Sequence, residues 1–172
     1  PHTTGTRVGM QYDEASKAMK VTWKVDDFIK VGNLPSQALT ADDITADGKA
    51  TFKFASKPDF TGTITYGTNN NGQSQADNDD YTHLAAVHTM TGTYSADNNT
   101  ISFEHSVSIL RIAFSGLPTS AIICGLTLPQ HGMYISFEDN GTRYTTTEGT
   151  FTAWVSMEAG TDIASLEFGL TY

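Results

Sequence analysis

Histidine side chains are the first candidates for acid–base chemistry or metal binding in this chain of 172 residues. His83 and His88 lie five positions apart, in a segment whose pattern predicts a short helix. On a helix, that spacing turns the two imidazoles about 140° away from each other, because each residue advances the helix by about 100°. The spacing therefore predicts no shared metal ion, since the ligands of a metal converge on one point.

A third histidine, His105, lies within the stretch ISFEHSVSILRIAFSGLP at residues 101–118. It shares the odd-numbered face of an apolar alternation with Ile101, Phe103 and Val107. A lone imidazole on an apolar face is more often a hydrogen-bonded packing residue than a metal ligand or a general base. We therefore expect a structural role for His105, on the core side or at the rim of a long central strand.

An acidic run, ADNDD at residues 76–80, is the second candidate for metal binding. Asp77, Asp79 and Asp80 are oxygen ligands of the kind that calcium prefers, but the run lacks the later glycine and glutamate of an EF-hand loop. Aspartates at such positions also form turns by accepting hydrogen bonds from the backbone. We favour turn formation, and the sequence predicts neither a metal site nor a cofactor.

The one cysteine, Cys124, cannot form a disulfide within the chain. It alternates with Ile122, Leu126 and Leu128, which predicts a buried thiol on the core face of a strand. A thiol in apolar surroundings has a raised pKa and is inert, so we expect no nucleophile here.

Three classes of function are disfavoured by the remaining signals. The sequence contains no G-x-S-x-G elbow, no phosphate-binding loop and no H-E-x-x-H motif, so we expect a non-enzymatic protein. A net charge of −9 argues against nucleic acid, whose phosphates need a basic surface. No stretch approaches the roughly 18 apolar residues of a membrane helix.

The elements that must position these side chains are predicted to be strands. Apolar and polar residues alternate with a period of two, which is typical of strands that are buried on one face only. Short turn signals such as ADGK and ADNN separate them. The alternating segments are KVTWKV (20–25), ATFKFA (50–55), GTITYG (62–67), GMYISFE (132–138), TFTAWVS (150–156) and SLEFGLTY (165–172). The pattern predicts an all-β chain, a two-sheet antiparallel sandwich in a single domain over residues 1–172.

Two segments depart from this pattern. Residues 69–90 begin as a polar run and then predict a short helix near 79–88, with Leu84 and Val87 facing the sheet. In the stretch that contains His105, the apolar residues change from odd to even positions, which requires an extra residue. We therefore predict a β-bulge or strand bend at residues 108–111, with Arg111 pointing outward.

Motifs along the chain resemble those of fimbrillin-like proteins, which comprise the pilins of type V pili and related surface lipoproteins. The run TRVGMQYDEASKAMKVTWKVDDFIKV (6–31) is similar to the family's opening, with a Thr-Arg pair followed by Trp23 and Asp27. The stretch ISFEHSVSILRIAF (101–114) resembles the family's strand with a phenylalanine, a histidine and an apolar run. Further similar segments are ATFKFASKPDFTGTITYG (50–67), DDYTHLAA (79–86) and GTFTAWVSMEAGTDIASLEFGLTY (149–172).

The resemblance implies a transthyretin-like Greek-key sandwich that corresponds to the N-terminal domain of these proteins. It implies export to the cell surface and a lipid anchor in the outer membrane, lost with the leader because the chain begins at Pro1. It also implies a structural or adhesive role in a fimbria or pilus, with other pilin subunits or a host or cell-surface ligand as partners. His105, Trp23 and Asp27 match family positions and are expected to be structural.

Pilins of this family polymerise by strand exchange, in which a protease removes an N-terminal strand after an arginine and a neighbouring subunit fills the open groove. Arg7 matches the family's Thr-Arg position and is a candidate processing position. Residues 1–6 are expected to be flexible. Family pilins usually carry two sandwiches, whereas only one is predicted here, which leaves polymerisation open.

An alternative function is that of a carbohydrate-binding module on a surface lipoprotein, because β-sandwiches host both roles. Sugar binding requires exposed aromatic side chains, and the candidates are Tyr134, Tyr144 and Trp154. Trp154 falls opposite the predicted core face of Phe151 and Val155, which places its side chain outside. An exposed tryptophan also marks contacts between subunits, and we favour that interpretation over sugar binding.

Overall fold

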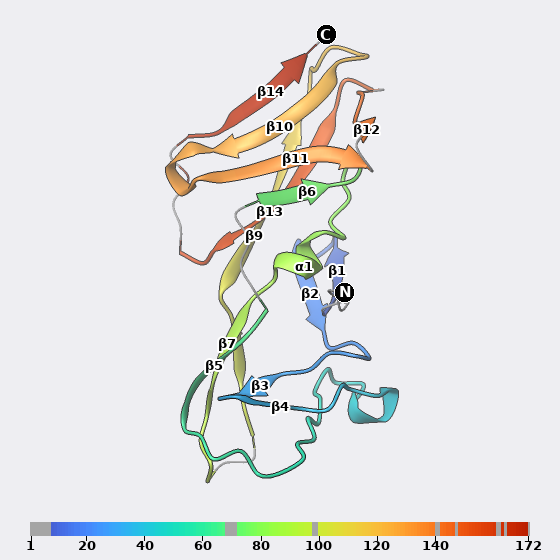
Figure 1. The fold of residues 1–172 in the computed structure, drawn as a ribbon. Coiled ribbons are helices and arrows are strands. Elements are labelled where there is room, and N and C mark those ends of the chain that lie inside the picture. Colours follow the sequence, from blue (N-terminus) through green and yellow to red (C-terminus); the bar gives the residue numbers. More distant parts are fainter. Residues whose placement is uncertain are drawn as a thin grey trace. The chain divides into compact units, whose positions relative to one another are not determined.

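The structure is a computed structural model that describes residues 8–67, 72–97, 100–139, 142–146, 148–160, 163 and 165–171. Arg7 and residues 1–6 lie outside the described residues. The fold is mostly β-strands with one short helix, and its strands form several antiparallel sheets (Figure 1). The all-β class is therefore confirmed.

The sequence predicts one domain, whereas the contacts divide the chain into two compact units. Unit 1 comprises Pro1–Thr68 and His88–Ser106, and unit 2 comprises Asn69–Val87 and Val107–Tyr172. Each unit has its own apolar core. The chain thus passes from unit 1 into unit 2, returns to unit 1, and then completes unit 2.

Unit 1 consists of short antiparallel pairs of strands. β1 pairs with β2, β3 pairs with β4, and β7 lies between β5 and β8. Its elements are β1 (Gly9–Asp13), β2 (Ala18–Thr22), β3 (Lys30–Val31), β4 (Leu34–Pro35), the 3-10 helix Ala41–Asp43, β5 (Gly62–Tyr66), β7 (Met90–Tyr94) and β8 (Phe103–His105).

Trp23 and Asp27 each join distant segments of unit 1. The Trp23 ring makes edge-to-face contacts with Phe52, Tyr66 and Phe103, at centroid distances of 5.0, 5.1 and 5.6 Å. The buried carboxylate of Asp27 accepts a hydrogen bond of 2.9 Å from the Tyr66 hydroxyl. Burying a carboxylate requires such partners, so Asp27 and Tyr66 fix each other's position.

Two predicted strands of unit 1 are not observed as predicted. Residues 50–55 form no strand, and Phe52 and Phe54 reach the core as half-buried side chains. The strand predicted over residues 20–25 ends at Thr22, because a tight turn with positive φ at Asp26 follows it. Val25 is therefore 47 % exposed rather than on the core face.

Unit 2 contributes strands from two sheets to one core. One sheet has the order β12-β11-β10-β14, with β6 pairing with β11, and the other sheet pairs β13 with β9 (Figure 1). Its elements are β6 (Gly72–Gln75), α1 (Leu84–Val87), β9 (Val107–Phe114), β10 (Ile122–Leu128), the 3-10 helix Pro129–His131, β11 (Met133–Asp139), β12 (Thr142–Arg143), β13 (Phe151–Glu158) and β14 (Glu167–Thr171). The fully buried core residues include Ile123, Leu126, Leu128, Ile135, Phe137, Phe151, Ala153 and Val155.

The bulge predicted at residues 108–111 is wrong. β9 pairs with β13 in a continuous register from Val107 to Phe114. The change of face instead coincides with a break at Ser106, where the chain leaves unit 1 for unit 2. Ile101 and Phe103 pack on the core of unit 1, whereas the even-numbered residues that follow pack on the core of unit 2.

A register shift does occur in β10, between Ile123 and Gly125. It places Ile123, rather than Ile122, on the core face together with Leu126. Cys124 is the residue at this irregularity, and it is half-buried instead of buried as the alternation predicts.

The helix predicted near residues 79–88 is observed as the shorter α1, in which Leu84 and Val87 are buried as expected. The residues before it form turns. Asp80 accepts hydrogen bonds from the backbone N–H and the hydroxyl of Thr82, at 2.9 and 3.0 Å.

Candidate interaction site at the outer edge of β13

Trp154 is buried, with 2 % of its surface exposed, so its predicted position outside the core is wrong. The alternation correctly places Phe151 and Val155 on the core face. The opposite face of β13, however, is covered as well, by residues from 72–87. The Tyr81 ring makes an edge-to-face contact with Trp154 at 5.4 Å. A strand covered on both faces cannot be recognised by alternation alone.

Two glutamine side chains from β6 bind the backbone of β13 along the edge that does not face β9. The Gln73 amide donates to the carbonyl of Ser156 at 2.6 Å and accepts from its N–H at 3.0 Å. Gln75 donates to the carbonyl of Thr152 at 2.8 Å and accepts from the N–H of Trp154 at 2.8 Å. Each amide thus presents a donor and an acceptor to β13, as a residue of a neighbouring strand would.

Two further side chains complete this edge. The N–H of Thr152 donates to the side-chain oxygen of Asn78 at 2.7 Å. The ring nitrogen Nε2 of His83 lies 3.1 Å from the carbonyl of Trp154, to which it donates. Both backbone groups of Thr152, Trp154 and Ser156 are therefore bonded to side chains. A row of side chains takes the place that a strand occupies in an ordinary sheet.

β6 holds these glutamines by pairing with β11, and it is a strand that the sequence does not predict. It lies parallel to β11, with Gln73 opposite Ile135 and Gln75 opposite Phe137. Both glutamines are at most 4 % exposed, whereas Gly72 and Ser74 face outward. The buried positions carry amides rather than apolar groups, so the segment reads as a polar loop. Only the two-residue spacing of the glutamines hints at a strand.

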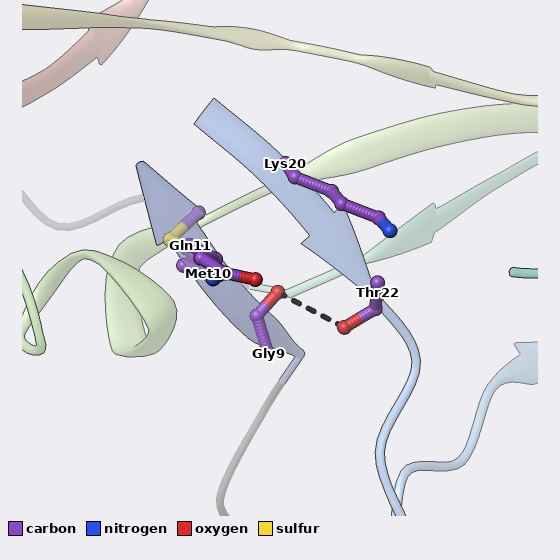
Figure 2. A pocket seen from close by; sticks show the side chains of 5 residues that line it. All are labelled: Gly9, Met10, Gln11, Lys20 and Thr22. Carbon is purple, nitrogen blue, oxygen red and sulfur yellow. Dashed lines mark hydrogen bonds between the residues drawn. The ribbon is translucent and has the colours of Figure 1, made fainter. Parts of the chain in front are cut away.

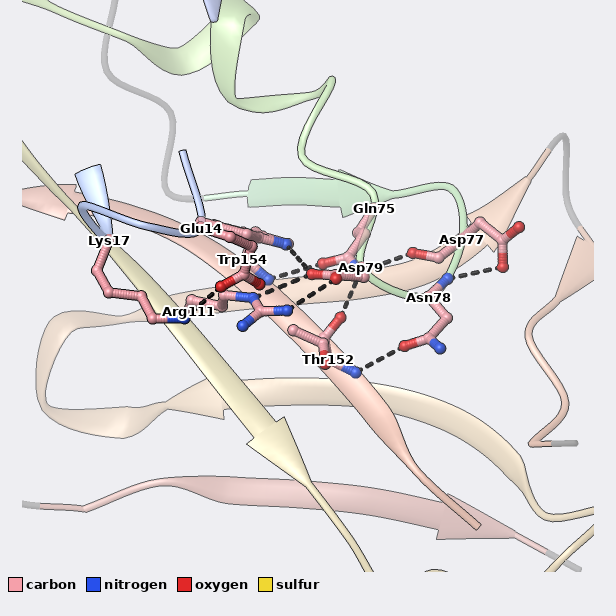
Figure 3. A network of polar contacts seen from close by, with 9 residues as sticks. All are labelled: Glu14, Lys17, Gln75, Asp77, Asn78, Asp79, Arg111, Thr152 and Trp154. Carbon is pink, nitrogen blue, oxygen red and sulfur yellow. Dashed lines mark hydrogen bonds and ion pairs between the residues drawn. The ribbon is translucent and has the colours of Figure 1, made fainter. Parts of the chain in front are cut away.

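The carboxylate of Asp79 binds one side chain from β9 and one from β13 (Figure 3). It accepts a hydrogen bond from the Trp154 indole N–H at 2.7 Å and from the Arg111 guanidinium at 2.8 and 3.2 Å. Burial alone raises the pKa of Asp79, but hydrogen bonds from Arg111 and Trp154 outweigh it and lower the pKa below its usual value. The guanidinium also lies 5.5 Å from the centroid of the indole ring. Asp79 and Arg111 therefore fix the orientation of Trp154.

The acidic run that was a calcium candidate uses its carboxylates within the chain. Asp77 accepts from the backbone N–H of Asn78 at 2.7 Å, while Asp79 and Asp80 have the partners given above. Within the part of the chain that the structure describes, no group of three or more His, Cys, Asp or Glu side chains converges on a metal position.

The three aromatic candidates for surface contact do not form one surface. Tyr134 is 48 % exposed, and its hydroxyl donates to the carbonyl of Cys124 at 3.1 Å. Tyr144 is half-buried and packs against Phe151, with ring centroids 4.9 Å apart. Because Trp154 is buried, Tyr134 alone of the three offers an exposed ring.

His105 is exposed at the end of the three-residue strand β8, so it lies at the rim of a short strand and not on the core side of a long one. Its Nδ1 lies 2.9 Å from Nε2 of the buried His88, and one of the two nitrogens donates to the other. Among the described residues, Nδ1 of His88 has no hydrogen-bond partner. A charged imidazolium is disfavoured here, because burial and then the neighbouring His105 lower the pKa of His88 to about 4.

We expect the free energy of unfolding to decrease as the pH falls from about 6.5 towards 4. Between these values the unfolded chain protonates His88 and the folded chain does not, so protons favour unfolding. At pH 5 the loss from this residue is about 2 kcal/mol relative to pH 7.5. Urea unfolding monitored at several pH values measures it.

The control for this pH dependence is a substitution of His88. H88Q removes the buried imidazole and should flatten the pH dependence. Burial also lowers the pKa of His83, so some slope should remain in H88Q. Equal slopes in H88Q and the unsubstituted chain would contradict the assignment.

A shallow hollow of about 300 Å³ lies on the β1–β2 hairpin and is lined by Gly9, Met10, Gln11, Lys20 and Thr22 (Figure 2). Its lining brings together one ammonium group with an amide and a hydroxyl, which is no arrangement for acid–base or nucleophilic chemistry. In the described residues, no helix has the length and hydropathy to cross a membrane.

Comparisons of this chain with protein-family models, with curated proteins and with solved structures each find no match.

Proposed function

We propose that the protein is a non-enzymatic structural or adhesive subunit of the cell surface, a fimbria or pilus component that assembles by exchange of β-strands. The proposal follows the resemblance to fimbrillin-like proteins and includes their transthyretin-like Greek-key sandwich. It also includes a lipid anchor in the outer membrane before maturation, and other subunits or a cell-surface ligand as partners.

The observation that carries this proposal is the origin of β6. Most of unit 2 is the continuous segment that begins at Val107, but β6 comes from the preceding part of the chain, between two strands of unit 1. Unit 2 is thus completed by a strand that its own continuous segment does not supply. A fold that accepts a strand from elsewhere in the chain has the groups needed to accept one from another chain.

The polar groups gathered at β13 support a structural rather than a catalytic role. The glutamines and His83 bind backbone groups, and Asp79 binds Arg111 and Trp154. None of these contacts leaves a nucleophile beside a general base, which hydrolytic and transfer reactions require. The sugar-binding alternative is supported less well, because Tyr134 is the one exposed ring among its three candidates.

We expect the concentrated protein to form oligomers that resist SDS and dissociate on heating, because exchanged strands are held by whole ladders of hydrogen bonds. Gel electrophoresis of unheated and heated samples detects them as a ladder that collapses to one band. A chain that begins at Val8 should form more of them if removal of the preceding segment opens a groove. A single band from both chains at all concentrations, together with saturable binding of a glycan, would favour the sugar-binding alternative.

A further inference from the structure

The arm, which we define as residues 72–87, emerges from a hairpin of unit 1. β5 and β7 pair with each other, with Tyr66 opposite Met90, and the arm lies in the connection between them. The chain closes tightly at its base, because a Cβ atom on Gly67 would lie 2.0 Å from the carbonyl oxygen of His88. The arm is therefore a long loop whose two ends meet, of the kind that leaves the body of a fold as one piece.

The arm contacts β11 and β13 of unit 2. Its backbone pairs with β11 at four positions, from Gly72 opposite Tyr134 to Gln75 opposite Phe137. Its side chains satisfy the edge of β13, Leu84 and Val87 are buried, and the Tyr81 ring packs on Trp154. The β6 part of the attachment is held by hydrogen bonds, each of which contributes only about 1 kcal/mol net. That part therefore opens more readily than an apolar strand would.

We propose that the arm exchanges between copies of this chain, so that the arm of one copy completes unit 2 of the next. An exchanged arm makes the same ladder with β11 and the same amide contacts with β13, so the contacts themselves favour neither arrangement. Exchange of an identical element is a low-cost route to association, and a head-to-tail exchange that does not close yields a filament. This inference rests on the proposed function and names the strand that is exchanged.

The register of β6 provides a direct test. Ser74 lies opposite Ser136, on a neighbouring strand at about 4.8 Å, which suits a disulfide. In a C124S background, we would refold S74C and S136C chains together from urea and oxidise the mixture. A disulfide between the two chains forms efficiently only where an arm of one copy pairs with β11 of the other. Non-reducing electrophoresis of chains of unequal tag length identifies the mixed dimer.

The matched control mixes S74C with S108C, since Ser108 is an exposed residue of β9 that does not pair with the arm. The mixed dimer of S74C and S136C should form about tenfold faster than this control, because paired residues have an effective concentration well above that of free chains. Equal rates would overturn the inference.

A second variant shows that the geometry permits the disulfide. The doubly substituted S74C/S136C chain, also C124S, should form an internal disulfide at high dilution. Failure to do so would contradict the register and overturn the inference as well. SDS-resistant oligomers with no mixed disulfide above the control would reject arm exchange while leaving strand exchange as the proposed function. A chain without oligomers of either kind would reject both.

Discussion

Replacing Gln75 by leucine should reduce the free energy of unfolding by about 3 kcal/mol, because it leaves the buried N–H of Trp154 without a partner and removes one of the two donors to the carbonyl of Thr152. The Gln75 amide accepts from the N–H of Trp154 and donates to the carbonyls of Thr152 and Asp77. Its side chain is fully buried, so water cannot replace it. Leucine has a similar volume, which separates the loss of hydrogen bonds from the creation of a cavity.

Denaturant unfolding followed by the fluorescence of Trp154, in a W23F background, measures this loss within unit 2. The matched control is S74A, because Ser74 belongs to the same strand but is exposed; we expect a change within about 0.5 kcal/mol. Q75E should destabilise at least as much as Q75L at neutral pH, since a carboxylate cannot donate to the carbonyl of Thr152. A Q75L variant as stable as S74A would show that the glutamine does not close the edge of β13.

The same glutamines mark the limit of what the sequence can predict. Alternation identifies β11 and β13, because Ile135, Phe137, Phe151 and Val155 are apolar and face one core. It cannot identify β6, because the buried side chains of β6 are amides rather than apolar groups. The hydrogen-bond partners of these amides are backbone atoms far away in the sequence; Gln75 and Trp154, for example, are separated by 79 positions. Burial of a polar side chain depends on those tertiary partners and not on the local pattern.

Trp154 and His105 show the same limit in segments whose apolar pattern is recognised correctly. The alternation correctly places Trp154 on the face of β13 opposite Phe151 and Val155. That face is covered by a segment from another part of the sequence, so β13 has a second buried face. The apolar pattern around His105 is also real, but it belongs to two strands in two units, divided at Ser106. A pattern shows that a face is buried and not which unit buries it.

Replacing Gly67 by alanine should cost about 3 kcal/mol or more, the largest effect that we expect of a single methyl group in this chain. Gly67 has φ +82, where an L residue is strained, and the new Cβ atom would lie 2.0 Å from the carbonyl oxygen of His88. The obstructing atom belongs to the backbone, so it cannot move aside as a side chain would. The two strand ends at the base of the arm would have to separate.

Gly48 provides the control for this substitution, because it has φ +83 and no atom lies within 4 Å of the position that a Cβ atom would take. G48A therefore carries the strain of positive φ alone, about 1 kcal/mol, and the difference between G67A and G48A isolates the contact with His88. Denaturant unfolding followed by the fluorescence of Trp23, in a W154F background, measures both in unit 1. If the two variants lose the same stability, the ends of the arm do not meet as described. If G67A loses more and also forms more exchanged oligomers, the close contact at Gly67 is what holds the arm within its own chain.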